Sequence, residues 1–205
     1  MRLYFAPFAC SMASRAALYE AGISADFSQT DIFRKRLEDG SDYRCVNPRG
    51  TVPAMELNDG RRLMDGIAIL EFIADSAPET KLAPPAGTYE RYQMQSWLSY
   101  IASDLHKGII WFLVAPHPPQ EAKAFARAQA PEKLEYLELA IKETGYLVGS
   151  DFTIADMYLG WALGLFRHLE ISLEPYPALT DFLERYLSRP SVSRARREEM
   201  TLLEN

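Results

Sequence analysis

The chain has 205 residues and a formal net charge of −6, and hydrophobic residues make up 48% of it. This length suits one large domain or two small ones, and the negative charge disfavours nucleic acid, which requires a basic surface. No apolar signal segment follows Met1 and no apolar run is long enough for a membrane span. The two cysteines are too few for a disulfide scaffold. We therefore expect a cytoplasmic enzyme or binding protein with no nucleic-acid or membrane partner.

The first segment predicts a strand over residues 2–6 and a helix over residues 11–21. Gly22 closes that helix, as glycine often does just past a helix end. Cys10 therefore falls at or just before the first helical turn, where unpaired N–H groups and the helix dipole favour an anion. The thiol is either a reactive sulfur or a buried, inert side chain. This stretch alone leaves both interpretations open.

Residues 27–32 predict a second strand, parallel to the first after a helical crossover, which makes a βαβ unit. The next stretch, Phe33-Arg-Lys-Arg-Leu37, is the most basic part of an acidic chain. It forms either a solvated surface or an edge that binds a carboxylate.

A hairpin follows in the sequence pattern. Asn58-Asp59-Gly60 lies between two short strand-like segments, residues 54–57 and 61–64, and is a strong hairpin signal. Val52-Pro53, just before the hairpin, can accommodate a cis peptide bond, although most such bonds are trans. From Asp65-Gly66 onward, apolar residues recur at helical spacing and predict another helix.

The sequence pattern changes from residue 78 onward. Residues 78–87 are rich in Pro and small residues and predict a linker. Beyond the linker the pattern is helical only, and Thr153-Ile-Ala-Asp156 is similar to a capping box. The helices are expected over residues 88–115, 120–144, from 153 onward, 181–188 and 191–200.

The predicted fold class is thus α/β plus all-α, in two domains. Residues 1–77 form the first domain, with the order βαβ-ββα. Residues 78–87 form the linker, and residues 88–205 form an all-helical domain.

Six short segments along the chain carry a family resemblance. They are Leu3-Tyr-Phe-Ala-Pro-Phe-Ala-Cys-Ser11, Val46-Asn-Pro-Arg-Gly-Thr-Val-Pro-Ala54, Asp59-Gly-Arg61, Glu90-Arg-Tyr-Gln-Met-Gln-Ser-Trp-Leu98, Ser103-Asp-Leu-His-Lys107 and Phe152-Thr-Ile-Ala-Asp-Met-Tyr-Leu159. Together they resemble the cytosolic glutathione transferases, and most closely the bacterial beta class. The resemblance implies a thioredoxin-like domain followed by a helical bundle. It also implies a cytoplasmic homodimer that conjugates the glutathione thiol to small hydrophobic electrophiles, as in detoxification.

By this resemblance, Cys10 faces the glutathione sulfur from the start of the first helix. Val52, followed by a cis Pro53, offers its backbone N–H and C=O to the tripeptide, a strand-like pairing that needs no particular side chain. Lys35 pairs with the glycyl carboxylate. Glutathione is the co-substrate, and no metal is expected.

At the γ-glutamyl end, the resemblance implies that Asp65 accepts from the ammonium and that the Gly66 N–H meets the carboxylate at a helix start. The family usually has Glu or Gln followed by Ser or Thr at these positions. Asp is one methylene shorter and Gly has no hydroxyl, so one hydrogen bond is missing, worth about 0.5–1.5 kcal/mol net. We expect weaker glutathione binding, not its loss.

The helical domain contributes further residues by the same resemblance. His106 approaches the sulfur, with Ser103 and Lys107 on the same helix face. An isolated histidine is by default structural, but the surrounding motif favours a functional His106. Asp104 is a candidate for reaching the glutathione bound to a partner subunit.

Three functions are to be distinguished. In conjugation, the glutathione thiolate attacks an electrophile, and the hydroxyls of Tyr4 and Ser11 are further candidates beside Cys10 and His106. Ser11 is an equal candidate for capping its helix.

In a redox reaction, Cys10 forms a mixed disulfide with glutathione. Because no second cysteine follows in a C-x-x-C pattern, only a monothiol mechanism is possible, and Cys45 is not expected to resolve it. In the third function, the fold is a binding or scaffolding module without catalysis.

Five apolar side chains are candidates for an electrophile pocket: Phe8, Trp111, Phe112, Leu113 and Phe166. We expect Trp111 and Phe112 to belong to the core, the commoner fate of aromatic residues at helical spacing. The three histidines lack the spacing of metal ligands. Asp156 is expected to cap a helix.

Overall fold

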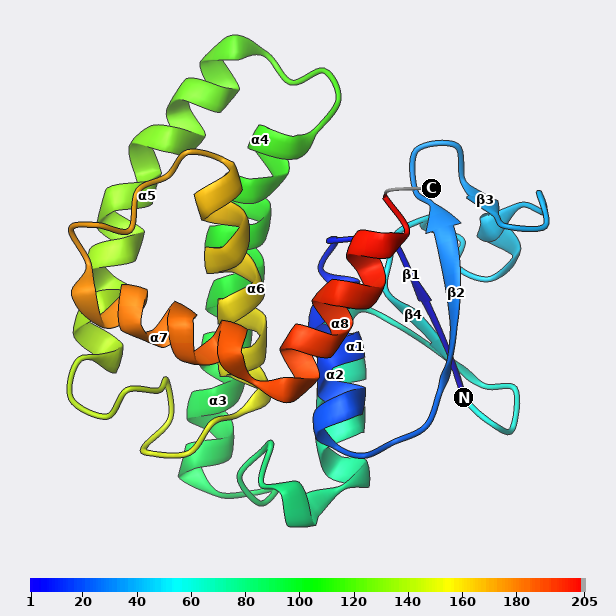
Figure 1. Cartoon of the computed structure of the whole chain (residues 1–205), viewed down its shortest axis with the longest axis horizontal. Coiled ribbons are helices and arrows are strands. Elements are labelled where there is room, and N and C mark those ends of the chain that lie inside the picture. The colour runs from blue at the N-terminus through cyan, green and yellow to red at the C-terminus, as the bar shows by residue number, and fades with distance from the viewer. Residues whose placement is uncertain (204–205) are drawn as a thin grey trace. The chain divides into compact units, whose positions relative to one another are not determined.

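The computed structural model describes residues 1–203 and divides into two compact units (Figure 1). The sheet unit consists of Met1–Leu82 together with the residues from Arg189 onward, and the helical unit consists of Ala83–Ser188. The sequence analysis placed everything from residue 88 onward in the helical domain. The structure instead groups the last helix, α8 (Pro190–Thr201), with the sheet, because α8 packs on α1 (Ser11–Glu20).

The sheet has five strands in the order β3-β2-β1-β4-β5. Their bounds are Arg2–Phe5 (β1), Asp26–Asp31 (β2), Arg36–Leu37 (β3), Ala54–Glu56 (β4) and Arg62–Met64 (β5). β1 and β2 are parallel, with Leu3 opposite Phe27, and α1 makes the crossover between them. β4 pairs antiparallel with β1 and with β5. The predicted βαβ unit and the hairpin at Asn58-Asp59-Gly60 are confirmed, whereas the two-residue strand β3 was not predicted.

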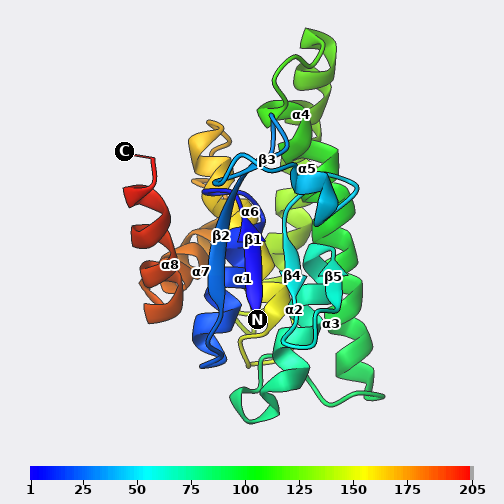
Figure 2. The same ribbon diagram turned by 90° about the vertical axis from the view of Figure 1, so that its right-hand side faces the viewer.

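Two helices cover one face of the sheet. Figures 1 and 2 show α1 and α2 (Gly66–Ser76) on this face, with α8 beside α1. The approach of α1 is close because Ala13, Ala16 and Ala17 are small and fully buried. Arg15 joins α1 to α8, since its guanidinium lies 2.5 Å from the carboxylate of Glu198. Short 3₁₀ turns occupy Tyr43–Cys45 and Pro78–Thr80.

The helical unit contains no strand within residues 83–188. Its elements are α3 (Tyr89–Tyr100), a π-helical segment (Ile101–Ile110), α4 (Trp111–Val114), α5 (Gln120–Ile141), α6 (Ile154–His168) and α7 (Pro177–Ser188). The predicted single helix over residues 88–115 is therefore wrong in its middle. A π-helix bonds residue i to residue i+5 and is rare, so a pattern search at the α-helical period does not reveal it.

Helix α6 is the most buried element of the helical unit. Thr153 and Asp156 form the predicted capping box at its start, which is confirmed. Along its length α6 packs on α3, α7 and the π-helical segment.

Gly160 gives a test of the packing between α6 and α7. A Cβ built on Gly160 would lie 2.3 Å from the ring of Tyr186, which is 1% exposed and has no room to move. Gly160→Ala is therefore expected to lower the free energy of unfolding by about 1–3 kcal/mol, the usual cost of overpacking a core. Urea unfolding measures this. Gly164→Ala is the control, because no atom lies within 4 Å of its added Cβ. Equal stability of the two variants would contradict the packing described.

Candidate functional site

Cys10 and Val52 lie together in the sheet unit. Cys10 is the residue just before α1, and its thiol donates to the Val52 carbonyl oxygen over 3.3 Å. The peptide bond between Val52 and Pro53 is cis, as the sequence analysis allowed. Cys10 is half-buried and Cys45 is exposed, and neither forms a disulfide with another described residue. The two positions that the sequence analysis placed around the sulfur are therefore in direct contact.

The residue before Val52 is held by two side chains that the sequence analysis missed. Tyr43 and Asn47 both donate to the Thr51 carbonyl oxygen, over 2.9 and 2.7 Å. Burial raises the pKa of Tyr43 to about 12, so its hydroxyl keeps its proton and remains a donor. Asn47 is fully buried. The position of Asn47 inside the Val46–Ala54 motif was the available signal for its role.

Asp65 and Gly66 lie at the start of α2. Asp65 caps the helix, since its Oδ1 accepts from the Ile67 N–H over 3.0 Å. Its backbone φ is +151°, a conformation that residues with a side chain rarely adopt and that is found disproportionately at functional sites. Arg49, another residue missed from the sequence, lies 3.6 Å from Asp65 Oδ2 and donates to the Met64 carbonyl.

Gly66 and Lys35 contact opposite ends of the segment Gly50–Pro53. A Cβ built on Gly66 would lie 3.7 Å from Pro53 Cδ, so the start of α2 is directly beside that proline. The Lys35 ammonium donates to the carbonyls of Gly50, over 2.9 Å, and Ile32. An ammonium has three donors, and these two hydrogen bonds use two of them. Lys35 is thus oriented by the backbone through two of its three donors.

Tyr4 and Ser11 do not fit the catalytic roles considered for them. Ser11 is fully buried, and its hydroxyl both donates to the Ala6 carbonyl and accepts from the Ala6 N–H, each over 3.2 Å. It therefore ties α1 to the residue that follows β1, and it does not cap the helix. Tyr4 is 5% exposed and packs against Tyr43, with ring centres 5.9 Å apart. We drop Ser11 and Tyr4 from the catalytic candidates.

His106 lies on the π-helical segment of the helical unit. Its Nδ1 is 2.7 Å from the hydroxyl of Tyr158, and its ring meets the Trp161 ring edge to face at 4.8 Å. Both aromatic residues belong to α6. The contacts fix the orientation of the imidazole, as expected for a histidine that acts in a site and also for a structural one.

The other predicted residues of the π-helical segment have partners within the helical unit. Ser103 donates to Asp104 and to the Ser99 carbonyl. The Lys133 ammonium donates to Asp104, and this hydrogen bond holds the pKa of Asp104 below its ordinary value. Lys107 is exposed, with its ammonium 5.0 Å from the centre of the Trp111 ring. A π-helix often occurs at a functional position, and this one carries all four predicted residues.

The aromatic candidates for an electrophile pocket differ from expectation. Trp111 and Phe112, expected in the core, are 50% and 37% exposed. Phe166 is fully buried, and it is therefore a core residue rather than a pocket residue. Phe8 and Leu113 are half-buried.

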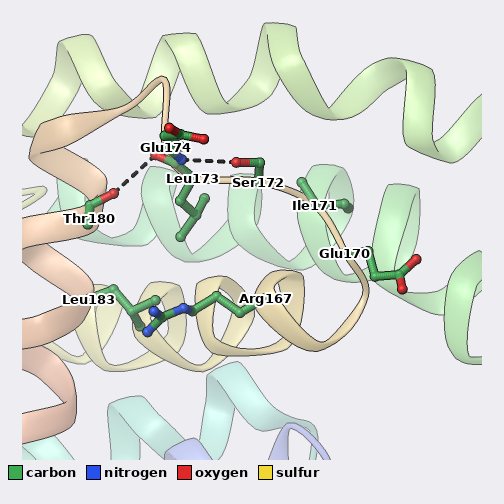
Figure 3. A pocket seen from close by; sticks show the side chains of 8 residues that line it. All are labelled: Arg167, Glu170, Ile171, Ser172, Leu173, Glu174, Thr180 and Leu183. Atoms are coloured by element: carbon green, nitrogen blue, oxygen red, sulfur yellow. Dashed lines mark hydrogen bonds between the residues drawn. The ribbon is translucent and has the colours of Figure 1, made fainter.

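A pocket of about 480 Å³ lies in the helical unit, at the loop between α6 and α7 (Figure 3). Its lining comprises Arg167, Glu170, Ile171, Ser172, Leu173, Glu174, Thr180 and Leu183. Thr180 donates to the Leu173 carbonyl and the Glu174 N–H donates to Ser172, so two hydrogen bonds hold the loop at this pocket. None of the residues predicted for the site lines it.

Residues 1–203 contain neither a metal-binding cluster nor a membrane-spanning helix. In that range, no group of three or more His, Cys, Asp or Glu side chains is arranged to hold a metal ion. None of the helices there combines the length and the apolar character needed to cross a membrane.

Comparison with known families identifies the class of protein. The family model described as glutathione S-transferase, N-terminal domain, matches residues 9–76, and that described as glutathione S-transferase, C-terminal domain, matches residues 103–196. Glutathione S-transferase GstA from Escherichia coli O157:H7 is 41% identical over 195 residues, which cover 95% of this chain and 96% of the relative. The chain therefore belongs to the glutathione S-transferase family.

Solved structures narrow the class further. The bacterial beta class glutathione S-transferase of Sphingomonas chungbukensis has a TM-score of 0.93 and 38% identity, covering 97% of this chain and 98% of that chain. A ternary complex of BphK, a bacterial GST, has a TM-score of 0.94 and 39% identity, covering 97% and 99%. A sphingomonad enzyme complexed with glutathione has a TM-score of 0.92 and 36% identity, covering 97% and 98%. The predicted family, its beta class affinity, the thioredoxin-like and helical fold, and the transferase class of enzyme are confirmed.

Proposed function

We propose that this transferase binds glutathione along the segment Gly50–Pro53 and directs its thiolate at small hydrophobic electrophiles. One observation carries the proposal. Site residues lie along the whole segment: Lys35 bonds Gly50, Tyr43 and Asn47 bond Thr51, Cys10 bonds Val52, and Gly66 lies beside Pro53. Glutathione has charged groups at both ends and a thiol in the middle. The segment likewise has a cation at one end, a thiol beside its third residue and a helix start at the other end.

The reaction requires a thiolate held in a fixed place. In conjugation, the glutathione sulfur forms a bond to the electrophilic carbon, and the leaving group departs with its electron pair while the thiol proton goes to solvent. Cys10, which donates to the Val52 carbonyl, is placed to redirect that hydrogen bond to the glutathione sulfur. Hydrogen bonds to a charged acceptor stabilise it, which favours the thiolate. Lys35 and the Asp65-Gly66 pair hold the two ends.

The remaining roles rest on the family resemblance. We propose that His106, Ser103 and Lys107 of the helical unit act on the sulfur and the electrophile, and that the protein is a cytoplasmic homodimer. Asp104 is proposed to reach glutathione in the partner subunit. The hydrogen bond from Lys133 keeps Asp104 ionised for such a contact.

Substitution of Cys10 tests the proposed function. Calorimetry is expected to show glutathione binding to the wild type, and an aryl halide to be conjugated. Cys10→Ala is expected to lower kcat for the aryl halide about tenfold, because one charge-assisted hydrogen bond to the sulfur is lost. His106→Ala is measured in parallel, and Cys45→Ala, at an exposed thiol outside the site, is the control.

Three results would contradict parts of the proposal. A wild type that does not bind glutathione refutes the function. A Cys10→Ala enzyme with unchanged rates refutes the role of the sulfur. Rapid reduction of a glutathione mixed disulfide, lost in Cys10→Ala and accompanied by negligible conjugation, establishes the monothiol reaction instead.

A further inference from the structure

The turn before Cys10 is bonded to the last helix of the chain. The Phe8 N–H donates over 2.7 Å to Oε2 of Glu199, a residue 191 positions later in the sequence. Glu199 lies on α8 and is fully buried. A carboxylate that is buried and accepts a backbone N–H holds that N–H in a well-defined position.

Other hydrogen bonds join residues within this turn. The Ala9 N–H donates to Ala6, the Met12 N–H donates to Ala9, and Ser11 bonds Ala6 in both directions. Phe8 has a φ of +57°, in the left-handed region that residues other than glycine seldom occupy. The bond to Glu199 is therefore a contact from outside the turn that holds its least favourable residue.

Charged side chains of α1 and α8 surround the carboxyl group of Glu199. Arg15 lies 3.8 Å from Oε1, and the neighbouring Glu198 binds Arg15 and Tyr19 on the same side of α1. Arg194, one turn earlier on α8, also pairs with Glu198. Burial raises the pKa of Glu199 to about 7, and the Phe8 N–H and Arg15 act in the opposite direction.

We propose that Glu199 is a positioning residue, which fixes the turn at Phe8 and thereby sets where the Cys10 thiol meets glutathione. The inference rests on the proposed function, since it takes Cys10 to lie beside the bound sulfur. It adds a part of the molecule that no motif near Cys10 indicates, namely the C-terminal helix.

The test separates the reach of residue 199 from its charge. Glu199→Asp keeps the charge but withdraws the carboxylate from Phe8 by one methylene, whereas Glu199→Gln keeps an acceptor at the same reach. Glu198→Gln is the matched control, because it breaks the ion pair with Arg15 and leaves the turn bonded. All variants are made in a Cys45→Ser background, so that iodoacetamide reports on Cys10.

The two Glu199 variants are expected to differ in kcat. Glu199→Asp is expected to lower kcat for conjugation about tenfold with little change in the KM for glutathione, and to change the alkylation rate of Cys10. Glu199→Gln restores most of kcat. Glu198→Gln lowers the melting temperature but leaves kcat and the alkylation rate as in the parent.

Two results would overturn the inference. One is a Glu199→Asp enzyme with the kcat and the alkylation rate of its parent. The other is an equal fall in kcat for Glu199→Asp and Glu198→Gln, which would assign both losses to stability. Failure of the parent to bind glutathione would refute the proposed function instead. The alkylation rates, which need no glutathione, would still decide whether Glu199 positions Cys10.

Discussion

Replacing Asp156 by Ala is expected to lower the free energy of unfolding by about 3 kcal/mol, because two buried N–H groups lose their acceptor at a cost of about 1–3 kcal/mol each. Asp156 is fully buried at the start of α6. Its carboxylate accepts from the N–H groups of Leu147 and Thr153 and from the Thr153 hydroxyl, each over 2.9 Å. One side chain therefore closes the capping box and fastens the preceding loop.

Tryptophan fluorescence during urea unfolding measures this loss. The three tryptophans, Trp97, Trp111 and Trp161, all lie in the helical unit, so the signal reports on the unit that contains Asp156. Asp156→Asn is expected to fall between the wild type and Asp156→Ala, because an amide has one acceptor oxygen for two N–H donors. Asp181→Ala, at an exposed position of α7, is the control. Asp156→Ala unfolding at the urea concentration of the control would contradict the account.

The carboxyl group of Asp156 also makes the stability of the folded protein depend on pH. Burial raises the pKa of Asp156 in the folded protein to about 6, above its ordinary value of 3.8. Between these two pH values, the folded state holds a proton that the unfolded state has lost. The part of the stability that depends on this bound proton is therefore complete below the lower value and is lost as the pH rises through about 6, whereas the hydrogen bonds that the carboxyl group accepts remain. The stability difference between the wild type and Asp156→Asn should narrow over this window.

Replacing Asp65 by Asn is expected to raise the KM for glutathione about tenfold while kcat stays within a factor of a few. The Asn side chain keeps an oxygen to accept from the Ile67 N–H, so the cap of α2 is preserved. What is lost is the negative charge proposed to meet the γ-glutamyl ammonium. Because binding is weakened equally in the ground and transition states, the effect appears in KM.

A matched control exists in the hairpin of the same unit. Asp59 is paired with Arg61, and its side chain is 52% exposed, the same fraction as that of Asp65. Asp59→Asn removes an equal charge outside the proposed site, so its KM should be that of the wild type. An equal change in KM for both variants would show that net charge, rather than contact at Asp65, governs binding.

The correctly predicted parts of the fold are those that a few neighbouring residues determine. Asn58-Asp59-Gly60 requires a tight turn, and Thr153 with Asp156 requires a helix start, so each feature is settled within a few residues. The strand β3, with two residues, is too short to leave a periodic pattern. The exposure of Trp111 and Phe112 depends on the helix surface that carries them, which composition does not give.

The parts of the site that were missed depend on contacts between distant segments. Cys10 and Val52 were predicted for the site because each belongs to a recognisable motif. The contact between Arg49 and Asp65 can be seen only in the structure. Glu199 is 191 residues from the Phe8 N–H that it holds. Ser11 became a catalytic candidate because Cys10 precedes it in the sequence, whereas its own hydroxyl is turned toward Ala6. Proximity in the chain indicated a role that burial excludes.

The grouping of α8 with the sheet bears on how the protein is made. Residues 1–82 are synthesised before the helical unit, and Arg189 only after it. At ordinary rates of translation, the delay is roughly 5–20 seconds. Until then the nascent turn at Phe8 has no Glu199 to bind. The unit that carries Cys10 is thus the first to emerge and the last to be completed.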